Sequence, residues 1–209
     1  MQRRGYDRWN GTRATASPSP RQPDSTYLPL AVGNTWEYRS SYERVVMRVT
    51  HQEVVNGNTC FVMDSFVGDS TEPAQREYFA VGSTGVEVYR RLQGGSDFFL
   101  DTPEPMLRFP VREGAHWTWQ APSTQGGVML AFEIKGERRT NVLGRDVTAL
   151  LVVIRGRASD GSEIQTKRWY CRGIGMLREQ TVLKKSGKAT TMESILQNYS
   201  LRVGPSASE

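Results

Sequence analysis

The sequence predicts an all-β protein built on a single antiparallel, strongly curved sheet, a half-barrel or barrel of about ten strands. Three observations support this prediction. Short β-rich runs alternate with turn clusters, apolar residues recur at every second position within the runs, and no convincing helical pattern is present. A period of two places successive side chains on opposite faces of a strand, so one face is expected to be buried and the other wet.

Turn signals separate the predicted strands. Asn56-Gly57 supplies the positive φ angles of a tight hairpin, and Asp160-Gly161 and Ser186-Gly187 mark two further hairpins. The stretch GVMLAFEIKG at 127–136 shows the clearest alternation of apolar and polar positions. The run VTALLVVI at 147–154 is apolar on both faces, so it is expected to form the most central strand.

The two ends of the chain differ from its middle. Residues 1–25 have no periodic apolar pattern and are rich in Pro, Ser, Arg and Gly. Such a segment buries too little apolar surface to offset the entropy of ordering it. We therefore expect a disordered or loosely docked basic tail over 1–25, a single β domain over 26–201 and a frayed C-terminus over 202–209.

Charge and hydropathy limit the function classes. The formal net charge is +5, and the five arginines and two aspartates of residues 1–25 contribute +3 of it. The rest of the chain is nearly neutral, which is weak for nucleic-acid binding. No apolar run approaches the roughly 18 residues of a membrane span. No signal peptide is recognisable after Arg3 and Arg4, so a cytoplasmic location stays open.

One motif occurs twice, in LPLAVGNTWEYR at 28–39 and in FPVREGAHWTWQ at 109–120, with a shift of 81 positions. Proline suits the start of a strand because it has no amide to donate. Glycine permits a positive φ angle, and aromatic residues two apart share one face of the following strand. The motif is read either as a strand entry with a plug for the core or as an aromatic platform for sugars, nucleobases or lipid. Its members are Pro29, Gly33, Trp36 and Tyr38, then Pro110, Gly114, Trp117 and Trp119.

The first copy of this motif and KRWYCRGIGMLREQ at 167–180 together resemble the TapB-like proteins, a diffuse group of bacterial cell-envelope proteins of unknown function. In the second stretch Trp169 and Tyr170 precede Gly173-Ile174-Gly175. The resemblance covers about 26–201. It implies a strongly curved antiparallel sheet, distantly akin to the half-barrels of lipoprotein carriers, and a periplasmic or extracellular location.

Two cysteines, Cys60 and Cys171, occur in the chain. The residues alone allow a disulfide, two buried thiols or one of each. A Cys60–Cys171 bond would fit an exported protein, as the resemblance implies, and two unpaired thiols would behave as small hydrophobes. There is no C-x-x-C, and His51 and His116 are far apart, so neither a metal nor a cofactor is expected.

The sequence offers no catalytic site. Nucleophile-elbow and phosphate-loop motifs are missing, and the two histidines are read as structural. Carboxylates in predicted loops, such as Asp160 and Glu163, leave a glycan hydrolase as one alternative. A weak nucleic-acid binder is the other alternative.

We therefore expect a non-catalytic accessory or interaction protein that binds a protein partner, in preference to a lipid or other apolar ligand, on its curved sheet. Peripheral membrane association stays open. The stretch GGSDFFLDTPEPMLRFP at 94–110 is expected to be a loop, either an exposed interface or a lid over the barrel mouth. Candidate ligand- or partner-binding residues are Trp36, Tyr38, Phe98, Phe99, Met106, Phe109, Trp117, Trp119 and Trp169, with tail contacts from Tyr6 and Trp9.

Overall fold

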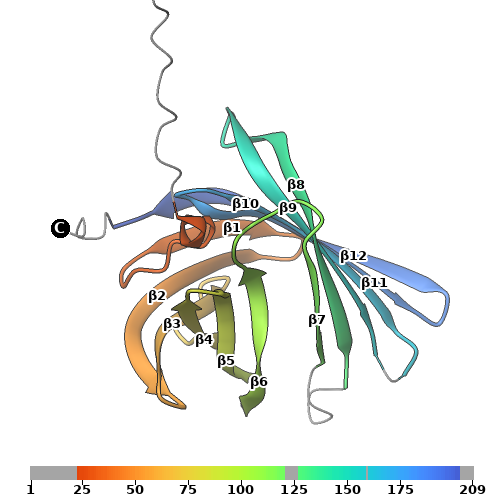
Figure 1. The fold of residues 1–209 in the computed structure, drawn as a ribbon, viewed down its shortest axis with the longest axis horizontal. Helices are drawn as coiled ribbons and strands as arrows, with labels where there is room; N and C mark the ends of the chain where they lie inside the picture. The colour runs from red at the N-terminus through yellow and green to blue at the C-terminus, as the bar shows by residue number, and fades with distance from the viewer. Residues whose placement is uncertain (1–22, 121–126, 159, 203–209) are drawn as a thin grey trace, which may run out of the picture.

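A computed structural model shows one antiparallel sheet that curls into a nearly closed barrel (Figure 1). The structure describes residues 23–120, 127–158 and 160–202. No helix in this part of the chain is long and apolar enough to span a bilayer. The elements are η1 Asp24–Tyr27, β1 Thr35–Ser40, β2 Arg44–Val55, β3 Asn58–Val67, β4 Gln75–Gly82, β5 Gly85–Gln93, β6 Ser96–Arg108, β7 His116–Gln120, β8 Met129–Val142, β9 Arg145–Arg157, β10 Glu163–Cys171, β11 Gly175–Lys185 and β12 Lys188–Ser200.

The twelve strands lie in the order β6-β5-β4-β3-β2-β1-β12-β11-β10-β9-β8-β7. Two six-stranded meanders, β1–β6 and β7–β12, are therefore joined by the pairing of β1 with β12, and β6 and β7 form the two edges. The predicted fold class is confirmed, with twelve strands in place of about ten. The run 147–154 lies in β9, third from an edge, so its predicted central position was wrong. A strand that is apolar on both faces is buried on both faces, but in a curled sheet such a strand can lie near the edge.

The repeated motif begins the first strand of each meander. The amide of Gly33 donates to the carbonyl of Val49 on β2 at 2.8 Å, and the amide of Gly114 donates to the carbonyl of Ile134 on β8 at 2.8 Å. Both glycines have a positive φ, 93° and 81°, which a side chain would strain. The motif is thus a strand-entry device that the fold uses twice.

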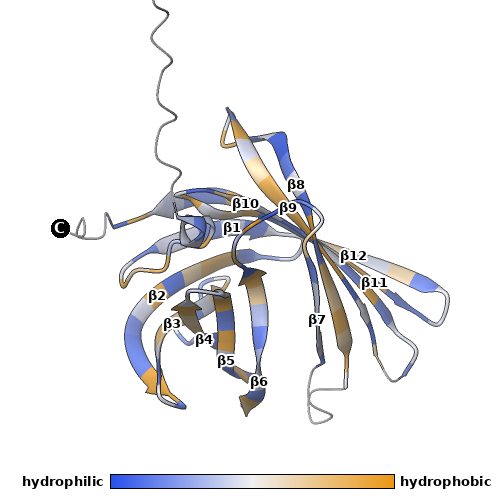
Figure 2. Ribbon diagram, viewed as in Figure 1, coloured by the Kyte–Doolittle hydropathy of each residue, from blue (hydrophilic) through white to orange (hydrophobic). Residues whose placement is uncertain are grey.

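Hydrophobic and hydrophilic positions alternate along many of the strands (Figure 2), and the hydrophobic ones build the core inside the barrel. The side chains of Trp36 and Tyr38 are buried. The Trp36 indole donates to the carbonyl of Ile174 at 2.5 Å, and the Tyr38 hydroxyl donates to the carbonyl of Met176 at 2.8 Å. A Cβ on Gly175 would lie 3.1 Å from the Trp36 indole nitrogen, so the glycine leaves room for the ring. The two sequence motifs therefore meet in the core.

Both cysteines are free and buried, so of the alternatives left open by the sequence the structure has two unpaired thiols and not a Cys60–Cys171 disulfide. Cys60 lies in a small cluster with Val62 and Tyr78, whereas Cys171 belongs to the main core. The two thiols thus lie in different apolar clusters. Burial raises the pKa of both thiols, which keeps them in the neutral form.

We expect stability to fall above about pH 10 and this loss to be weaker in Tyr38→Phe. Burial raises the pKa of Tyr38 above its value in the unfolded chain. The contribution of this shift to the free energy of unfolding is therefore complete below the unfolded pKa, and it is lost as the pH rises towards the folded pKa. At pH 7 the variant should lose about 1 kcal/mol with its hydrogen bond. Urea denaturation from pH 7 to 11 measures both effects. Tyr42→Phe, at an exposed position, is the control, and equal alkaline losses in both variants would contradict the assignment.

Candidate functional site

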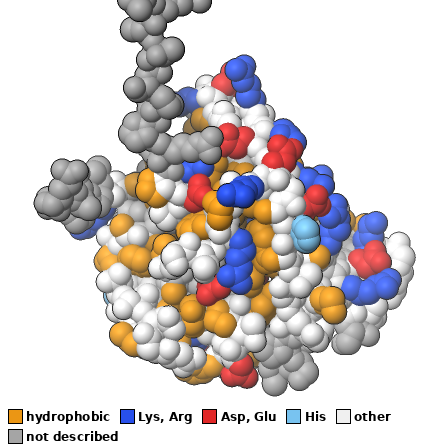
Figure 3. All heavy atoms as spheres, viewed as in Figure 1, with side chains coloured by type: hydrophobic (Ala, Val, Ile, Leu, Met, Phe, Trp, Pro, Cys, Tyr) orange, Lys and Arg blue, Asp and Glu red, His pale blue; other side chains and the backbone are white. Residues whose placement is uncertain are grey.

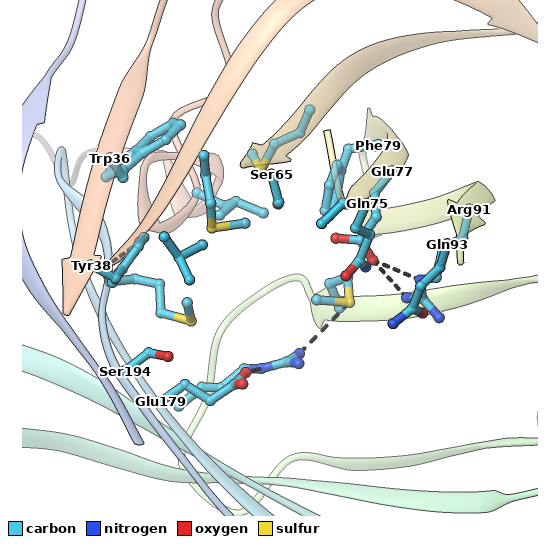
Figure 4. Close-up of a pocket in the computed structure, with 18 of the residues that line it drawn as sticks. Trp36, Tyr38, Ser65, Gln75, Glu77, Phe79, Arg91, Gln93, Glu179 and Ser194 are labelled. Atoms are coloured by element: carbon cyan, nitrogen blue, oxygen red, sulfur yellow. Dashed lines mark hydrogen bonds and ion pairs between the residues drawn. The ribbon is translucent and has the colours of Figure 1, made fainter. Parts of the chain in front are cut away.

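The barrel contains a cavity of about 570 Å³ between the inner faces of β1–β6 and β10–β12 (Figure 4). Interior side chains can just fill a barrel of about eight strands, whereas this sheet has twelve. Leu28, which follows η1, contributes to the wall, and the exposed Ala74 and Gln93 mark the opening. In the space-filling view, hydrophobic side chains lie over the region of β4 to β6, between acidic and basic ones (Figure 3).

Much of the cavity wall is apolar and adaptable. Four methionines contribute to it, and methionine has an unbranched, polarisable side chain that adjusts to different shapes. The aromatic rings of Trp36, Tyr38 and Phe79 add large apolar surfaces on β1 and β4. The methionines are Met47, Met63, Met106 and Met176.

Five charged side chains form a group here called the inner charge network. Four of them line the cavity, and Glu104 lies behind the wall as a partner of one of the four. Arg91 pairs with Glu77 at 2.8 Å and with Glu104 at 3.0 Å, and Arg168 pairs with Glu179 at 2.6 Å. Burial alone would lower the pKa of each arginine, but the neighbouring carboxylates outweigh it and raise the pKa. Charges this deeply placed are tolerated because they are paired.

Bulges turn two of these charged side chains into the barrel. On β5, Val88 lies opposite Phe79 and Arg90 lies opposite Tyr78, so one extra residue shifts the alternation and Arg91 faces inward. On β11, a second irregularity between positions 176 and 178 has the same effect, and Glu179 faces the cavity. A bulge re-aims the side chains that follow it.

The barrel is closed at one place by side chains. Among the described strands, β6 and β7 form no backbone ladder with each other, and we call the gap between them the seam. Across it, the Trp117 indole donates to the carbonyl of Pro105 at 3.0 Å, and the Trp119 indole donates to the carbonyl of Thr102 at 2.9 Å. Trp117 also stacks on Phe132, with ring centroids 5.3 Å apart.

The segment 94–110 was predicted to be a loop, and this was wrong, because Ser96–Arg108 forms edge strand β6. The two prolines of β6 were read as loop signals, but an edge strand tolerates residues without an amide. They are Pro103 and Pro105, and the carbonyl of Pro105 serves the seam.

The predicted site residues are distributed over several places. Trp36, Tyr38 and Met106 line the cavity, and Trp117 and Trp119 close the seam. Phe109 packs against the core, Phe98 is half-buried, and Phe99 is 53% exposed beneath the Arg90 guanidinium. Trp169 packs against the core next to Arg178 without lining the cavity. Tyr6 and Trp9 lie outside the described residues.

Sequence reasoning missed the inner charge network. Four of its members look like ordinary polar residues on the wet face of strands, and Glu104 was assigned to the predicted loop 94–110. The inward direction of Arg91 depends on a bulge that no turn residue marks. Glu77 is a partial exception, because the run of alternating residues in β4 places it on the same face as Phe79.

The residues considered for chemistry are dispersed. His51 and His116 are exposed. Asp160 pairs with Lys185, which holds the pKa of that carboxyl below its usual range, and Glu163 pairs with Arg157. Within the described ranges, no three His, Cys, Asp or Glu side chains form a group that could hold a metal ion. The expectation of a non-catalytic protein stays a prediction.

Comparisons with known proteins gave two solved structures. No family model matched the chain, and no curated protein matched it significantly. A predicted lipoprotein from Parabacteroides distasonis is 12% identical, over 83% of this chain and 98% of that one, with a TM-score of 0.47. A predicted exported protein with a YmcC-like fold from Bacteroides fragilis is 11% identical, with the same coverages and a TM-score of 0.43. The TapB-like resemblance and the envelope location stay predictions.

We expect Trp117→Phe and Trp119→Phe each to destabilise the fold by about 1 kcal/mol, because each removes one hydrogen bond across the seam. Hydrogen exchange should rise most in β6. Urea denaturation and exchange mass spectrometry measure the two effects. Trp169→Phe is the matched control, since the Trp169 indole makes no hydrogen bond within the described part of the chain. Unchanged exchange in β6 would show that the indoles do not hold the seam.

Arg91→Met should destabilise the protein by about 3–5 kcal/mol, because it leaves the carboxylates of Glu77 and Glu104 buried without a partner. The exposed pair of Arg44 and Glu37 offers a control, and Arg44→Met should shift the midpoint far less. Chemical denaturation compares the two variants. Similar shifts in both would mean that the inner charge network is as well solvated as the surface.

Proposed function

We propose that the protein binds a small amphipathic molecule inside its barrel, without transforming it. The observation that carries the proposal is the cavity of about 570 Å³ in the barrel interior. Pockets for small ligands commonly measure roughly 300–1,000 Å³ and combine an apolar lining with a few polar groups. This cavity matches that pattern in both size and lining.

The two kinds of lining define the two parts of the ligand. The apolar part would lie among the methionines and against the rings of Trp36 and Phe79. The polar part would lie beside the pairs formed by Arg91 and Arg168. Since the methionines can adopt several shapes, the cavity is suited to a class of related molecules. An envelope location, which the sequence motifs imply, would place lipids and other amphiphiles within reach and forms part of the proposal.

A protein partner was the preferred expectation from the sequence, and it stays a prediction. The exposed hydrophobic side chains of the described residues are spread over separate strands and turns, such as Tyr42, Val54, Met129 and Leu143. Scattered apolar residues are normal on a monomer surface. Phe99 is exposed but is partly covered by Arg90. The cavity therefore gives the stronger support to a small ligand.

Binding of the neutral dye N-phenyl-1-naphthylamine tests this proposal. The dye should fluoresce on binding to the wild-type protein, and Ser65→Trp should weaken binding at least tenfold. Ser65 lines the cavity from β3, so an indole there would occupy the ligand's space. Gln52→Trp, at an exposed position of β2, should bind the dye like the wild type.

Two results would overturn the proposal. One is a wild-type protein that does not bind the dye. The other is a Ser65→Trp variant that is folded, as judged by its circular dichroism, and binds the dye with unchanged affinity.

A further inference from the structure

The inner charge network crosses the barrel interior from one meander to the other. Glu77, Arg91 and Glu104 come from β4, β5 and β6, and Arg168 and Glu179 come from β10 and β11. Arg91 bridges two carboxylates, and Glu104 is also close enough to favour the charged form of Arg168. The attraction between Glu104 and Arg168 thus couples the two parts of the network into one electrostatic unit, although no ion pair among the described residues joins them.

The charges of this unit do not balance. Three carboxylates face two guanidiniums, which leaves one negative charge. The side chains of Glu77 and Glu104 are 12% and 8% exposed, so water compensates little of it. Arg91 and Arg168 are the two cationic side chains among the described residues that line the cavity, and both already serve the network.

The hydrogen bonds leave acceptors open at the cavity. In each of Glu77, Glu104 and Glu179, one carboxylate oxygen accepts from arginine, and the second has no hydrogen-bond partner among the described residues. Glu77 and Glu179 line the cavity, on β4 and β11 (Figure 4). A donor from a ligand could therefore reach a free oxygen on either side.

Some donors in the network also lack a strong partner. The Nη1 group of Arg91 has no hydrogen-bond partner among the described residues. A terminal nitrogen of Arg168 lies 3.8 Å from the sulfur of Met106, and a thioether is a poor acceptor. An anionic ligand would improve the contacts of these two donors. It would also add a second negative charge to a poorly solvated unit, whereas a cation would neutralise the first. The balance of charge therefore decides in favour of a cation.

Resting on the proposed binding function, we propose that the ligand carries a cationic head group, a protonated amine or quaternary ammonium, which lies between Glu77 and Glu179 and neutralises the inner charge network. Its apolar tail then lies against Met47, Met63 and the ring of Phe79, which line the same cavity. The site is thus selective for amphiphilic amines over fatty acids of equal length.

The test is displacement of bound N-phenyl-1-naphthylamine at pH 7.5 by three molecules with the same tail: dodecylamine, dodecanol and dodecanoate. An alkylamine resembles the lysine ammonium, with a pKa of about 10.4, and is charged under these conditions. We expect half-displacement by dodecylamine at a concentration at least tenfold below that of dodecanoate, with dodecanol between them. Circular dichroism at each end point verifies that the amphiphile has not unfolded the barrel.

The charge itself is tested with Glu104→Gln. Glu104 belongs to the network but does not line the cavity, so the change removes the excess charge and leaves the cavity wall in place. The amine-to-carboxylate ratio, normalised to the dye affinity of each protein, should fall about tenfold. Glu163→Gln, on the exposed end of β10, should keep the wild-type ratio. If Glu104→Gln does not fold, Glu179→Gln replaces it.

The outcomes separate the two proposals. Equal displacement by all three molecules, preference for dodecanoate, or no displacement by any of them would overturn the cationic head group while the dye still reports a working cavity. An amine preference that persists in the folded variant would exclude the network charge as its cause. If the folded Ser65→Trp variant binds the dye with unchanged affinity, the proposed function itself is overturned.

Discussion

The seam between β6 and β7 is the constraint on which the rest of the structure depends. A curled sheet can close into a barrel only if its two edge strands meet, and here β6 and β7 meet through side chains. Trp117 and Trp119 replace a backbone ladder with two indole hydrogen bonds to carbonyls of β6. Pro103 and Pro105 of β6 have no amides to donate, so a backbone ladder to β7 would lack hydrogen bonds at these two positions. The two tryptophans of the second copy of the repeated motif thus join β7 to β6, a role that backbone hydrogen bonds fill between the other neighbouring strands of the sheet.

Closure of the sheet at the seam explains why the protein has an interior cavity. A curled sheet of twelve strands encloses more space than its inward side chains fill. The β7–β9 side is packed, with Phe132 stacked on Trp117 and Ile134 and Val152 buried in the core. The opposite side keeps the empty volume, and the paired charges lie where the two meanders face each other. Shape and electrostatics of the candidate site are therefore both products of the same topology.

The sequence predicted the fold class because alternation with a period of two is a local property. The spacing around Gly33 and Gly114 predicted a strand entry as one of two readings of the repeated motif, and a strand begins just after each glycine. The charge network was not recognised, because its members come from five strands and two of them face inward only after a bulge. A bulge shifts the alternation by one residue, so periodicity assigns Arg91 to the wrong face. For Cys60 and Cys171 the sequence left both a disulfide and two free thiols open, because the distance between two residues of different strands cannot be read from a linear pattern.

The pairing of β1 with β12 has a consequence for how the chain acquires this fold. During synthesis β1 emerges first, and the partner for one of its edges is made last, because Thr35 lies opposite Ser200. Until then the first meander exposes two unpaired edges, at β1 and β6, and such edges are open to pairing with other chains. Contacts between distant parts of a chain are also formed slowly. The first meander therefore stays vulnerable to such pairing from the time its own strands are made until β12 pairs with β1.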